Sequence, residues 1–538
     1  MRIKLFFLFI LLITSSCIFP DNFYVRDPNI DILHYRFGIK ISDNNNLIKG
    51  ETLVRLKLES DPSSKVSLDL HGTQPDKTGM NVSEVFSQDK KLNFSHNNNK
   101  LEIALEKIYY PGEIVQIKIV YQGIPAKGLI ITDNKFGIKT FLGDNWPDKA
   151  HYWLPCIDHP SDKASCEFII SAPSHYQIVA TGKLKETTDL PDNYRRSHWV
   201  EYAPVATKVM MICISHFAVN HQEVFRNVPV QTWVFPEERE EGFKDFSITK
   251  KVLEFYWGLI GPFSYSKIAS VQAPTNFGGL ENAGAISYYQ NSVAPEGRPE
   301  SLIAHEMAHQ WFGDSVTESD WNHVWLSEGF ATYFTAVYME FNKSKSNFKK
   351  IMKRSRERVI KYFYKKNHSS IVDYKIEKLR GILNTNSYQK GAWFLHMLRR
   401  KLGDETFFKG IRTYYSKYMN MNALTGDFRE CMETVSGEDL STFFNQWVYK
   451  PGIPVIKWKW KYNKRKKLID LKIYQVQRTG TIYDIPLEFG IFRNGSSEPE
   501  IVRVRVDRKR NTHKIGFDEV PEDIKIDPDI SMLMKVIQ

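Results

Sequence analysis

The sequence predicts a multidomain α+β protein in which a mostly helical block lies between two β-rich blocks. At 538 residues the chain is too long for a single hydrophobic core. Short alternating apolar segments, separated by turns rich in Asn, Gly and Pro, dominate the first part of the chain. Apolar residues at helical spacing dominate the middle, and alternation returns near the end.

The first residues are typical of an export signal. Arg2 and Lys4 precede the apolar run Leu5–Ile13, which is too short to cross a bilayer as a helix. We therefore expect residues 1–17 to be a signal peptide. Cys17 resembles the lipid-modified cysteine of bacterial lipoproteins, which implies a periplasmic or outer-surface protein with a lipid anchor in the membrane. Plain secretion is the alternative.

Residues 18–226 are expected to form an all-β domain. Its strand-like segments include Tyr35–Ile41, Glu51–Leu58, Ile114–Tyr121 and Lys208–Ser215. Four cysteines follow Cys17 at wide spacings that match neither a zinc pattern nor a dense disulfide framework. We expect them to be buried side chains, although Cys156 and Cys166 could pair in an oxidising compartment.

Residues 227–450 are expected to be mostly helical, and residues 451–538 to form a small β domain. The helical segments are Phe243–Ile260, Glu300–Gly313, Leu326–Phe341, Lys345–Lys365, Tyr388–Leu402 and Asp404–Tyr418. The last domain opens with a predicted hairpin of Val455–Tyr462 and Leu468–Val476. Its Lys and Arg residues alternate with apolar ones, which favours a solvated sheet face over a binding patch.

The charge balance argues against a nucleic-acid-binding protein. The formal net charge is +11, but 73 basic residues are spread along the chain among 62 acidic ones. We find no nucleic-acid-binding motif. A generally basic, solvated surface is the better interpretation.

One short motif points to a metal-dependent hydrolase. His305–His309 reads H-E-x-x-H, and apolar neighbours predict that it lies on a helix. Two histidines four residues apart share one helix face, so both imidazoles can reach one zinc ion. Glu328, nineteen residues after His309, is the expected third ligand. Phe312 and Ser315 occupy the positions where a metzincin would have Gly and His, which excludes that class.

The segments around these residues resemble the aminopeptidase N family of gluzincin zinc metallopeptidases, which includes the membrane alanyl aminopeptidase and leukotriene hydrolase types. The metal ligands lie in His305–Asp314 and Trp325–Ala331. Gly278–Asn282 resembles the family's G-x-M-E-N exopeptidase motif, with Leu280 in place of Met. Tyr388–Ala392 resembles its Y-x-K-G-A motif.

Weaker similarity continues through Leu154–Pro160 and Gln446–Pro454, so the resemblance covers nearly the whole mature chain in order. It implies a saddle-like N-terminal β domain, a thermolysin-like catalytic domain and a C-terminal domain like a β-sandwich. It also implies one Zn²⁺ per chain, held by His305, His309 and Glu328.

The resemblance further assigns the catalytic residues. Glu306 would act as general base toward the attacking water, and Tyr388 would donate a hydrogen bond to the developing oxyanion. Both roles belong to a zinc aminopeptidase that removes the N-terminal residue of peptides.

Gly278, Gly279, Leu280, Glu281 and Asn282 are the expected substrate-binding residues. Glu281 would pair with the free α-ammonium group of a peptide and so select N-termini. The two glycines would let the backbone approach an extended substrate, which would add to the protein as an extra strand.

Two positions depart from the family pattern. Many relatives have a Gln or Glu that supplies a second contact to the amine, and within Phe141–Pro147 the candidate for that role is Asp144. Ser327 replaces the usual Asn before the ligand Glu, a change expected to affect the helix start more than the chemistry.

Three alternatives to an aminopeptidase stay open at this point. They are a zinc endopeptidase, an epoxide hydrolase on the same fold, and a non-catalytic peptide-binding lipoprotein. The sequence indicates neither the side-chain preference at the cleaved residue nor an oligomeric state.

Overall fold

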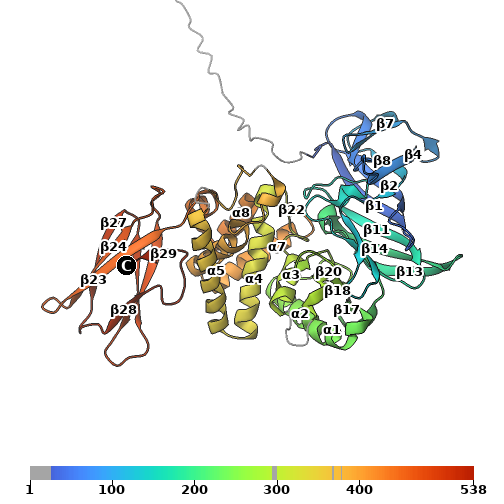
Figure 1. Cartoon of the computed structure of the whole chain (residues 1–538). Coiled ribbons are helices and arrows are strands. Elements are labelled where there is room, and N and C mark those ends of the chain that lie inside the picture. Colours follow the sequence, from blue (N-terminus) through green and yellow to red (C-terminus); the bar gives the residue numbers. More distant parts are fainter. Residues whose placement is uncertain (1–25, 294–299, 366–368, 377, 538) are drawn as a thin grey trace, which may run out of the picture.

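A computed structural model describes residues 26–293, 300–365, 369–376 and 378–537. Figure 1 shows three parts in chain order, with β-sheets at one end, a helical part in the centre and a second set of sheets at the other end. The predicted multidomain α+β class is therefore confirmed. The predicted signal peptide and Cys17 lie outside the described residues.

The N-terminal part is built on an eight-stranded sheet in which β1 and β11 pair in parallel and all other neighbours are antiparallel. In spatial order the strands are β13 (Lys183–Leu190), β14 (Tyr194–Ala206), β11 (Lys163–Pro173), β1 (Ile30–Lys40), β2 (Ile48–Leu58), β8 (Ile114–Ile124), β4 (Gly79–Ser87) and β5 (Lys90–Lys91). Side chains of β2 alternate between buried and exposed, as expected for a strand with one face in the core.

Two smaller sheets complete this part. One contains β3 (Ser63–Asp69), β7 (Lys100–Tyr109) and β6 (Phe94–Asn97). The other contains β12 (Gln177–Ala180), β15 (Ile212–Ser215), β10 (Lys139–Gly143) and β9 (Leu129–Asp133). Cys156 and Cys166 are both buried and unpaired.

A five-stranded sheet spans the boundary that the sequence predicted between residues 226 and 227. Its order is β16 (Ala218–Phe225), β17 (Val228–Val234), β18 (Ile268–Ala273), β20 (Ala285–Tyr289) and β19 (Gly279–Leu280). The sequence did not predict the last three strands. Every residue of β18 is buried, so this strand lacks the alternation that identifies a strand in a sequence.

The helical part follows this sheet. Its helices are α1 (Arg239–Asp245), α2 (Thr249–Leu259), α3 (Glu300–His309), α4 (Trp325–Asn342), α5 (Lys345–Lys365), α6 (Gly391–Leu402), α7 (Asp404–Tyr418), α8 (Thr425–Ser436) and α9 (Ser441–Phe444). The short strands β21 (Thr317–Glu318) and β22 (Asn422–Ala423) pair beside them. α3 ends four residues before the predicted Gly313, whose φ of 119° belongs to the turn that leaves the helix.

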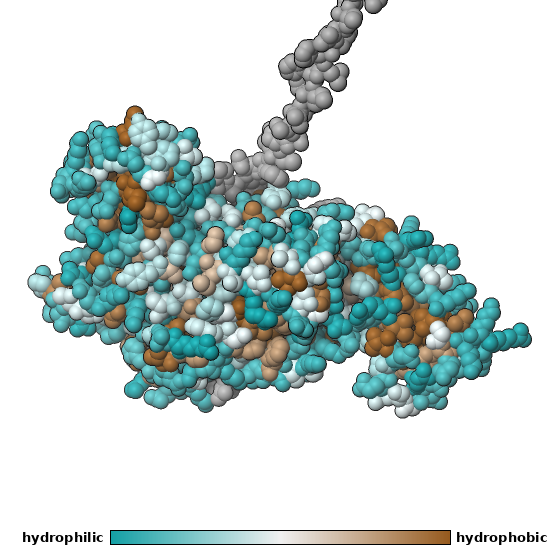
Figure 2. All heavy atoms as spheres, turned by 180° about the vertical axis from the view of Figure 1, so that it is seen from behind, coloured by the Kyte–Doolittle hydropathy of each residue, from teal (hydrophilic) through white to brown (hydrophobic). Residues whose placement is uncertain are grey.

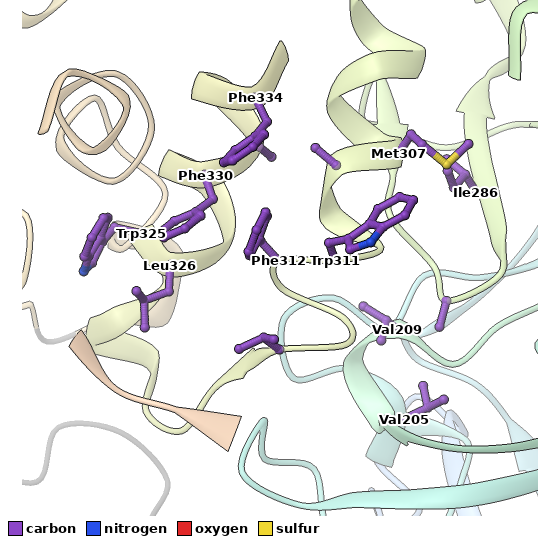
Figure 3. Packing of buried hydrophobic residues seen from close by; sticks show 14 of the residues in the cluster. Val205, Val209, Ile286, Met307, Trp311, Phe312, Trp325, Leu326, Phe330 and Phe334 are labelled. Carbon is purple, nitrogen blue, oxygen red and sulfur yellow. The ribbon is translucent and has the colours of Figure 1, made fainter. Parts of the chain in front are cut away.

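An aromatic core fixes α3 against α4 (Figure 3). The ring of Phe312, just after α3, lies 4.7 Å from the ring of Phe330 and 5.1 Å from that of Phe334, both on α4. On the other side of α3, Met307 points toward Ile286 of β20 in Figure 3. All five side chains are fully buried, so α3 is held on both sides.

The C-terminal part contains two sheets. The four-stranded one has the order β27 (Arg510–Gly516), β24 (Leu468–Gln475), β23 (Val455–Asn463) and β29 (Lys535–Ile537). The three-stranded one has the order β26 (Glu500–Val506), β25 (Ile485–Phe492) and β28 (Asp523–Ile526). The predicted hairpin is confirmed, because β23 and β24 pair antiparallel from Ile456 to Asn463.

Figure 2 shows a mainly hydrophilic surface, with the C-terminal part at the right carrying a group of hydrophobic residues. Exposed apolar side chains of this part include Val476, Ile482 and Ile501. Among the described residues, no helix combines the length and the apolar character that a membrane crossing requires.

Candidate active site

The three predicted metal ligands come together between two helices. His305 and His309 lie one turn apart on α3, and Glu328 lies in the first turn of α4. One ligand atom from each residue lies within 4.8 Å of the others. The Oε2 atom of Glu328 is 3.8 Å from His305 Nε2 and 3.4 Å from His309 Nε2.

This group of side chains fits a zinc ion. Two imidazoles and one carboxylate are the ligand set of many catalytic zinc sites, which leave one position for water. Oε2 of Glu328 is buried and has no hydrogen-bond partner within the described residues. A buried carboxylate oxygen without a donor is costly unless a cation neutralises it, so the site is suited to a metal.

His309 is oriented by contacts on its other ring nitrogen. Its Nδ1 lies 3.2 Å from the carbonyl oxygen of Phe312 and 3.0 Å from the hydroxyl of Ser327. The sequence predicted that Ser327 affects the helix start more than the chemistry. Although Ser327 does lie in the first turn of α4, it also contacts a candidate ligand, and such outer contacts fix ring orientation.

Glu306 lies beside the three ligands under the backbone of β19. A Cβ atom on Gly279 would come within 2.5 Å of the Glu306 carboxyl group, so a larger residue at that position would force Glu306 to move. The sequence predicted a close approach of this backbone to a substrate, and the structure shows that Glu306 is its close neighbour within the protein. Burial raises the pKa of Glu306 to about 8, and the nearby carboxylates of Glu281 and Glu328 act in the same direction.

Glu281 directly follows β19, the strand at the edge of the five-stranded sheet. Its side chain is buried, and Oε1 has no hydrogen-bond partner within the described residues. The backbone of Glu281 is held by Gln310, whose Nε2 donates to the Glu281 carbonyl at 2.9 Å. Gln310 also accepts from Gly284 N at 2.8 Å and donates to Asp314 Oδ2 at 2.8 Å.

Tyr388 lies in a π-helical turn, Asn386–Lys390, that leads into α6. Its ring is nearly parallel to that of His305, with ring centres 6.4 Å apart. Burial and the nearby carboxylate of Glu328 raise the pKa of Tyr388 well above its usual value, so the hydroxyl keeps its proton.

Two glycines allow α4 and the Tyr388 turn to approach each other. A Cβ atom on Gly329 would lie 3.0 Å from the Cα of Gly391 and 3.0 Å from the Ser387 carbonyl oxygen. Gly329 follows Glu328, and Gly391 belongs to the motif that contains Tyr388. This close crossing places the tyrosine beside the metal ligands.

These side chains line one cavity. Its walls are Trp146, Phe277, Gly279, Leu280, Glu281, His305, Glu306, His309, Glu328, Leu383 and Tyr388. The predicted catalytic residues, metal ligands and exopeptidase glutamate therefore share one space. The aromatic and aliphatic side chains beside them form an apolar wall.

Three predicted substrate-binding residues do not line this cavity. The Asp144 carboxylate is buried and bonded to Lys149 Nζ at 2.6 Å, so the structure does not bring it to the site. Gly278 accepts a backbone hydrogen bond from Tyr289, and Asn282 Nδ2 lies 3.2 Å from the Ser287 hydroxyl. These two residues flank the strand β19 and Glu281, which directly follows it.

The sequence reasoning missed several supporting residues. Gln310 lies inside the His305–Asp314 motif, yet its long-range bonds to the Glu281 segment leave no local pattern. Lys208 forms a fully buried ion pair with Glu318, with Nζ and Oε1 2.5 Å apart. The burial of their polar side chains would have identified these residues, but a single sequence does not show which side chains are buried.

Two family models match the chain. The M1 peptidase N-terminal domain model matches residues 32–208, and the M1 peptidase family domain model matches residues 245–447. Together they cover more than half of the chain. This chain belongs to peptidase family M1. The second match contains the cavity's metal ligands and Glu281.

Curated relatives of this M1 chain carry aminopeptidase names. It is 25% identical over 411 residues to glutamyl aminopeptidase of Rattus norvegicus, an alignment of 72% of this chain and 42% of that protein. It is 25% identical over 468 residues to probable aminopeptidase 2 of Sulfurisphaera tokodaii, with 84% and 58% covered. Probable aminopeptidase 1 of Saccharolobus solfataricus is 24% identical over 530 residues, with 92% and 64% covered. The chain thus spans less than two thirds of each of these relatives.

Proposed function

We propose that this M1 chain is a zinc-dependent aminopeptidase that releases the N-terminal residue of peptides. The observation that carries the proposal is the position of Glu281. Its buried Oε1 atom lacks a hydrogen-bond partner within the described residues and lines the same cavity as the three metal ligands. A carboxylate in that place is suited to bind the α-ammonium group of a substrate whose first peptide bond faces the metal ligands.

The remaining residues have complementary roles in this proposal. Zinc, held by His305, His309 and Glu328, would make a water molecule more acidic and polarise the substrate carbonyl. Glu306 would accept the proton of that water and deliver it to the leaving amine, a task for which a raised carboxyl pKa is suited. The Tyr388 hydroxyl would donate a hydrogen bond to the oxyanion.

The free edge of β19 supports an extended binding mode. β19 pairs only with β20 among the described strands, so its other edge can form main-chain hydrogen bonds with a peptide. Gly279 in this strand also keeps space for Glu306 beneath it. The substrate backbone would therefore lie along the same segment that ends in Glu281.

Removing the base while keeping the metal tests the proposed mechanism. We expect Glu306→Gln to lose about 100-fold or more of turnover on aminoacyl fluorogenic substrates. The purified variant should retain one zinc per chain, measured by elemental analysis. Glu300→Gln is the matched control, because Glu300 lies on the same helix and bonds instead to Asn342 and Lys343. Full turnover in Glu306→Gln would refute the mechanism.

Removing the metal tests the cofactor. A chelator should abolish turnover, and added Zn²⁺ should restore it.

We also propose that the protein is exported, on the basis of the basic and apolar pattern of residues 2–13. Fractionation of producing cells would test this, and recovery in the cytoplasm would contradict it.

A further inference from the structure

The outer face of the C-terminal four-stranded sheet carries an unusual concentration of positive charge. The strand register places nine side chains on this face in a grid of three rows. The rows are Lys457, Tyr474 and Arg510; Lys459, Lys472 and Thr512; and Lys461, Asp470 and Lys514. Six of the nine are cations and one is a carboxylate. We call these nine residues the basic face.

The opposite side of β23 and β24 is mainly apolar and belongs to the core of this part. Trp458, Trp460 and Tyr462 alternate with the lysines of β23, and Ile469, Leu471 and Ile473 alternate with the polar residues of β24. The buried side therefore fixes which residues point outward, because a slip of one residue would exchange the two faces.

The basic face has one carboxylate for its six cations, Asp470, which lies opposite Lys461 and Lys514. None of the six forms an ion pair with any residue that the structure describes. Lys459 lies directly opposite Lys472, an arrangement of like charges that destabilises a sheet. An anionic partner would remove this repulsion.

Further cations surround the grid. Lys464, Arg465, Lys466 and Lys467 form the exposed turn between β23 and β24, and Arg508 and Lys509 lie just before β27. The sequence predicted a solvated sheet face here from the alternation within β23. What the sequence did not reveal is that β24 and β27 add their cations to the same face.

We propose that the basic face binds the anionic headgroups of a lipid membrane. Neighbouring strands lie about 5 Å apart and alternate residues along a strand about 7 Å apart, so the cations are closely spaced on one face of a twisted sheet. Such a face can bring several cations to a surface of negative charge at once. The cations lie on the face of a four-stranded sheet, which is wider than the α-helix or two-stranded ribbon that a major groove admits, and residues 455–537 contain no helix. Both features favour the membrane over a duplex.

The position of the basic face is compatible with catalysis on soluble peptides. β23, β24 and β27 lie at the end of the molecule farthest from the N-terminal sheets (Figure 1). The candidate active site lies instead between α3 and α4. Contact of the basic face with a membrane would leave the cavity accessible.

Vesicle binding by the full chain tests this proposal. Vesicles of phosphatidylcholine alone report any attachment through the N-terminal segment, and vesicles with added phosphatidylglycerol report the anion-dependent part. We expect the anion-dependent affinity to fall about 100-fold in Lys457→Gln/Lys459→Gln/Lys472→Gln, since each cation near a membrane contributes about fivefold. Added salt should weaken the wild-type interaction.

The matched control removes three lysines elsewhere. Lys65, Lys90 and Lys183 are exposed on the N-terminal part, and Lys65→Gln/Lys90→Gln/Lys183→Gln lowers the net charge equally. This control should keep the wild-type affinity, and both variants should keep wild-type turnover. Equal loss in both variants, or no loss in either, would overturn the proposal. So would tighter binding to a DNA duplex than to the phosphatidylglycerol vesicles.

Discussion

His309 has oxygen atoms at both sides of its ring. Glu328 lies near Nε2, while the Phe312 carbonyl and the Ser327 hydroxyl lie near Nδ1. A histidine that donates from Nδ1 presents the lone pair of Nε2, which is the form that binds a metal. Ser327 is also close to Gly313, where a Cβ would lie 2.2 Å from the serine hydroxyl.

Ser327→Ala should weaken zinc binding by about tenfold, because His309 would lose one of its two outer contacts. The remaining Phe312 carbonyl should keep the ring in place. Competition with a chromogenic chelator measures the affinity. Thr335→Val is the comparison, since the Thr335 hydroxyl is 3.5 Å from His305 Nδ1 and already donates to the Ala331 carbonyl. A larger loss in Thr335→Val than in Ser327→Ala would contradict this account.

At the scale of elements, β19 and α3 approach so closely that one glycine decides the geometry. Gly279→Ala would place a methyl group within 2.5 Å of the Glu306 carboxyl group, so Glu306 must move. We expect kcat to fall about 100-fold, as small displacements of catalytic groups commonly cost. Gly278→Ala is the control, because its Cβ would lie 3.6 Å from Leu302, an ordinary contact. Equal turnover in the two variants would show that Glu306 need not stay in this position.

The crossing of α4 and α6 depends on a second close approach. Gly391→Ala would press a methyl group within 3.0 Å of the Gly329 backbone, and we expect a loss of about 1–3 kcal/mol in unfolding free energy. Gly258→Ala in α2 has open space around its Cβ, and the same change there should be neutral or stabilise by up to about 1 kcal/mol. Denaturant titration measures both. Similar effects at the two sites would mean that the crossing is not tight.

Local spacing in the sequence predicts some parts of the site, whereas contacts between distant segments cannot be predicted in this way. The spacing of His305 and His309 is local, so helical periodicity alone places both on one face. Gly329 and Gly391 are 62 residues apart in the sequence, and no local pattern predicts that they are in contact. For the same reason the resemblance named Tyr388 without explaining what brings it beside His305. Asp144 was chosen by its position in the chain, and in the structure its carboxylate is bonded to Lys149 and does not line the cavity.

At the scale of the whole molecule, the C-terminal sheets are joined to the helical part by polar contacts. Asp527 pairs with Arg356 and Asp529 with Lys349, both on α5. His396 of α6 lies with Nε2 3.0 Å from the Ile530 carbonyl, which makes the ring nitrogen the donor. Burial lowers the pKa of His396 to about 3.

Acid should therefore weaken the fold through His396. The unfolded chain binds a proton on this histidine near pH 6.5, whereas the folded protein does so only near pH 3. The stability that the neutral ring provides is present above pH 6.5 and is lost as the pH falls toward 3, with a slope of about 1.4 kcal/mol per pH unit. Denaturant unfolding at several pH values measures how the unfolding free energy depends on pH. In His396→Gln, the contribution of this one proton to the slope should be missing. The same slope in His396→Gln and in the wild-type protein would contradict this account.

The most direct measurement compares one peptide with a free N-terminus and the same peptide with an acetylated N-terminus. We expect the zinc-loaded protein to release the first residue only from the free peptide. Glu281→Gln should lower kcat/KM for the free peptide about 100-fold, because a charge-assisted hydrogen bond is lost, and should keep its zinc. Equal cleavage of the free and acetylated peptides by the wild-type protein would contradict the role of Glu281 and indicate an endopeptidase.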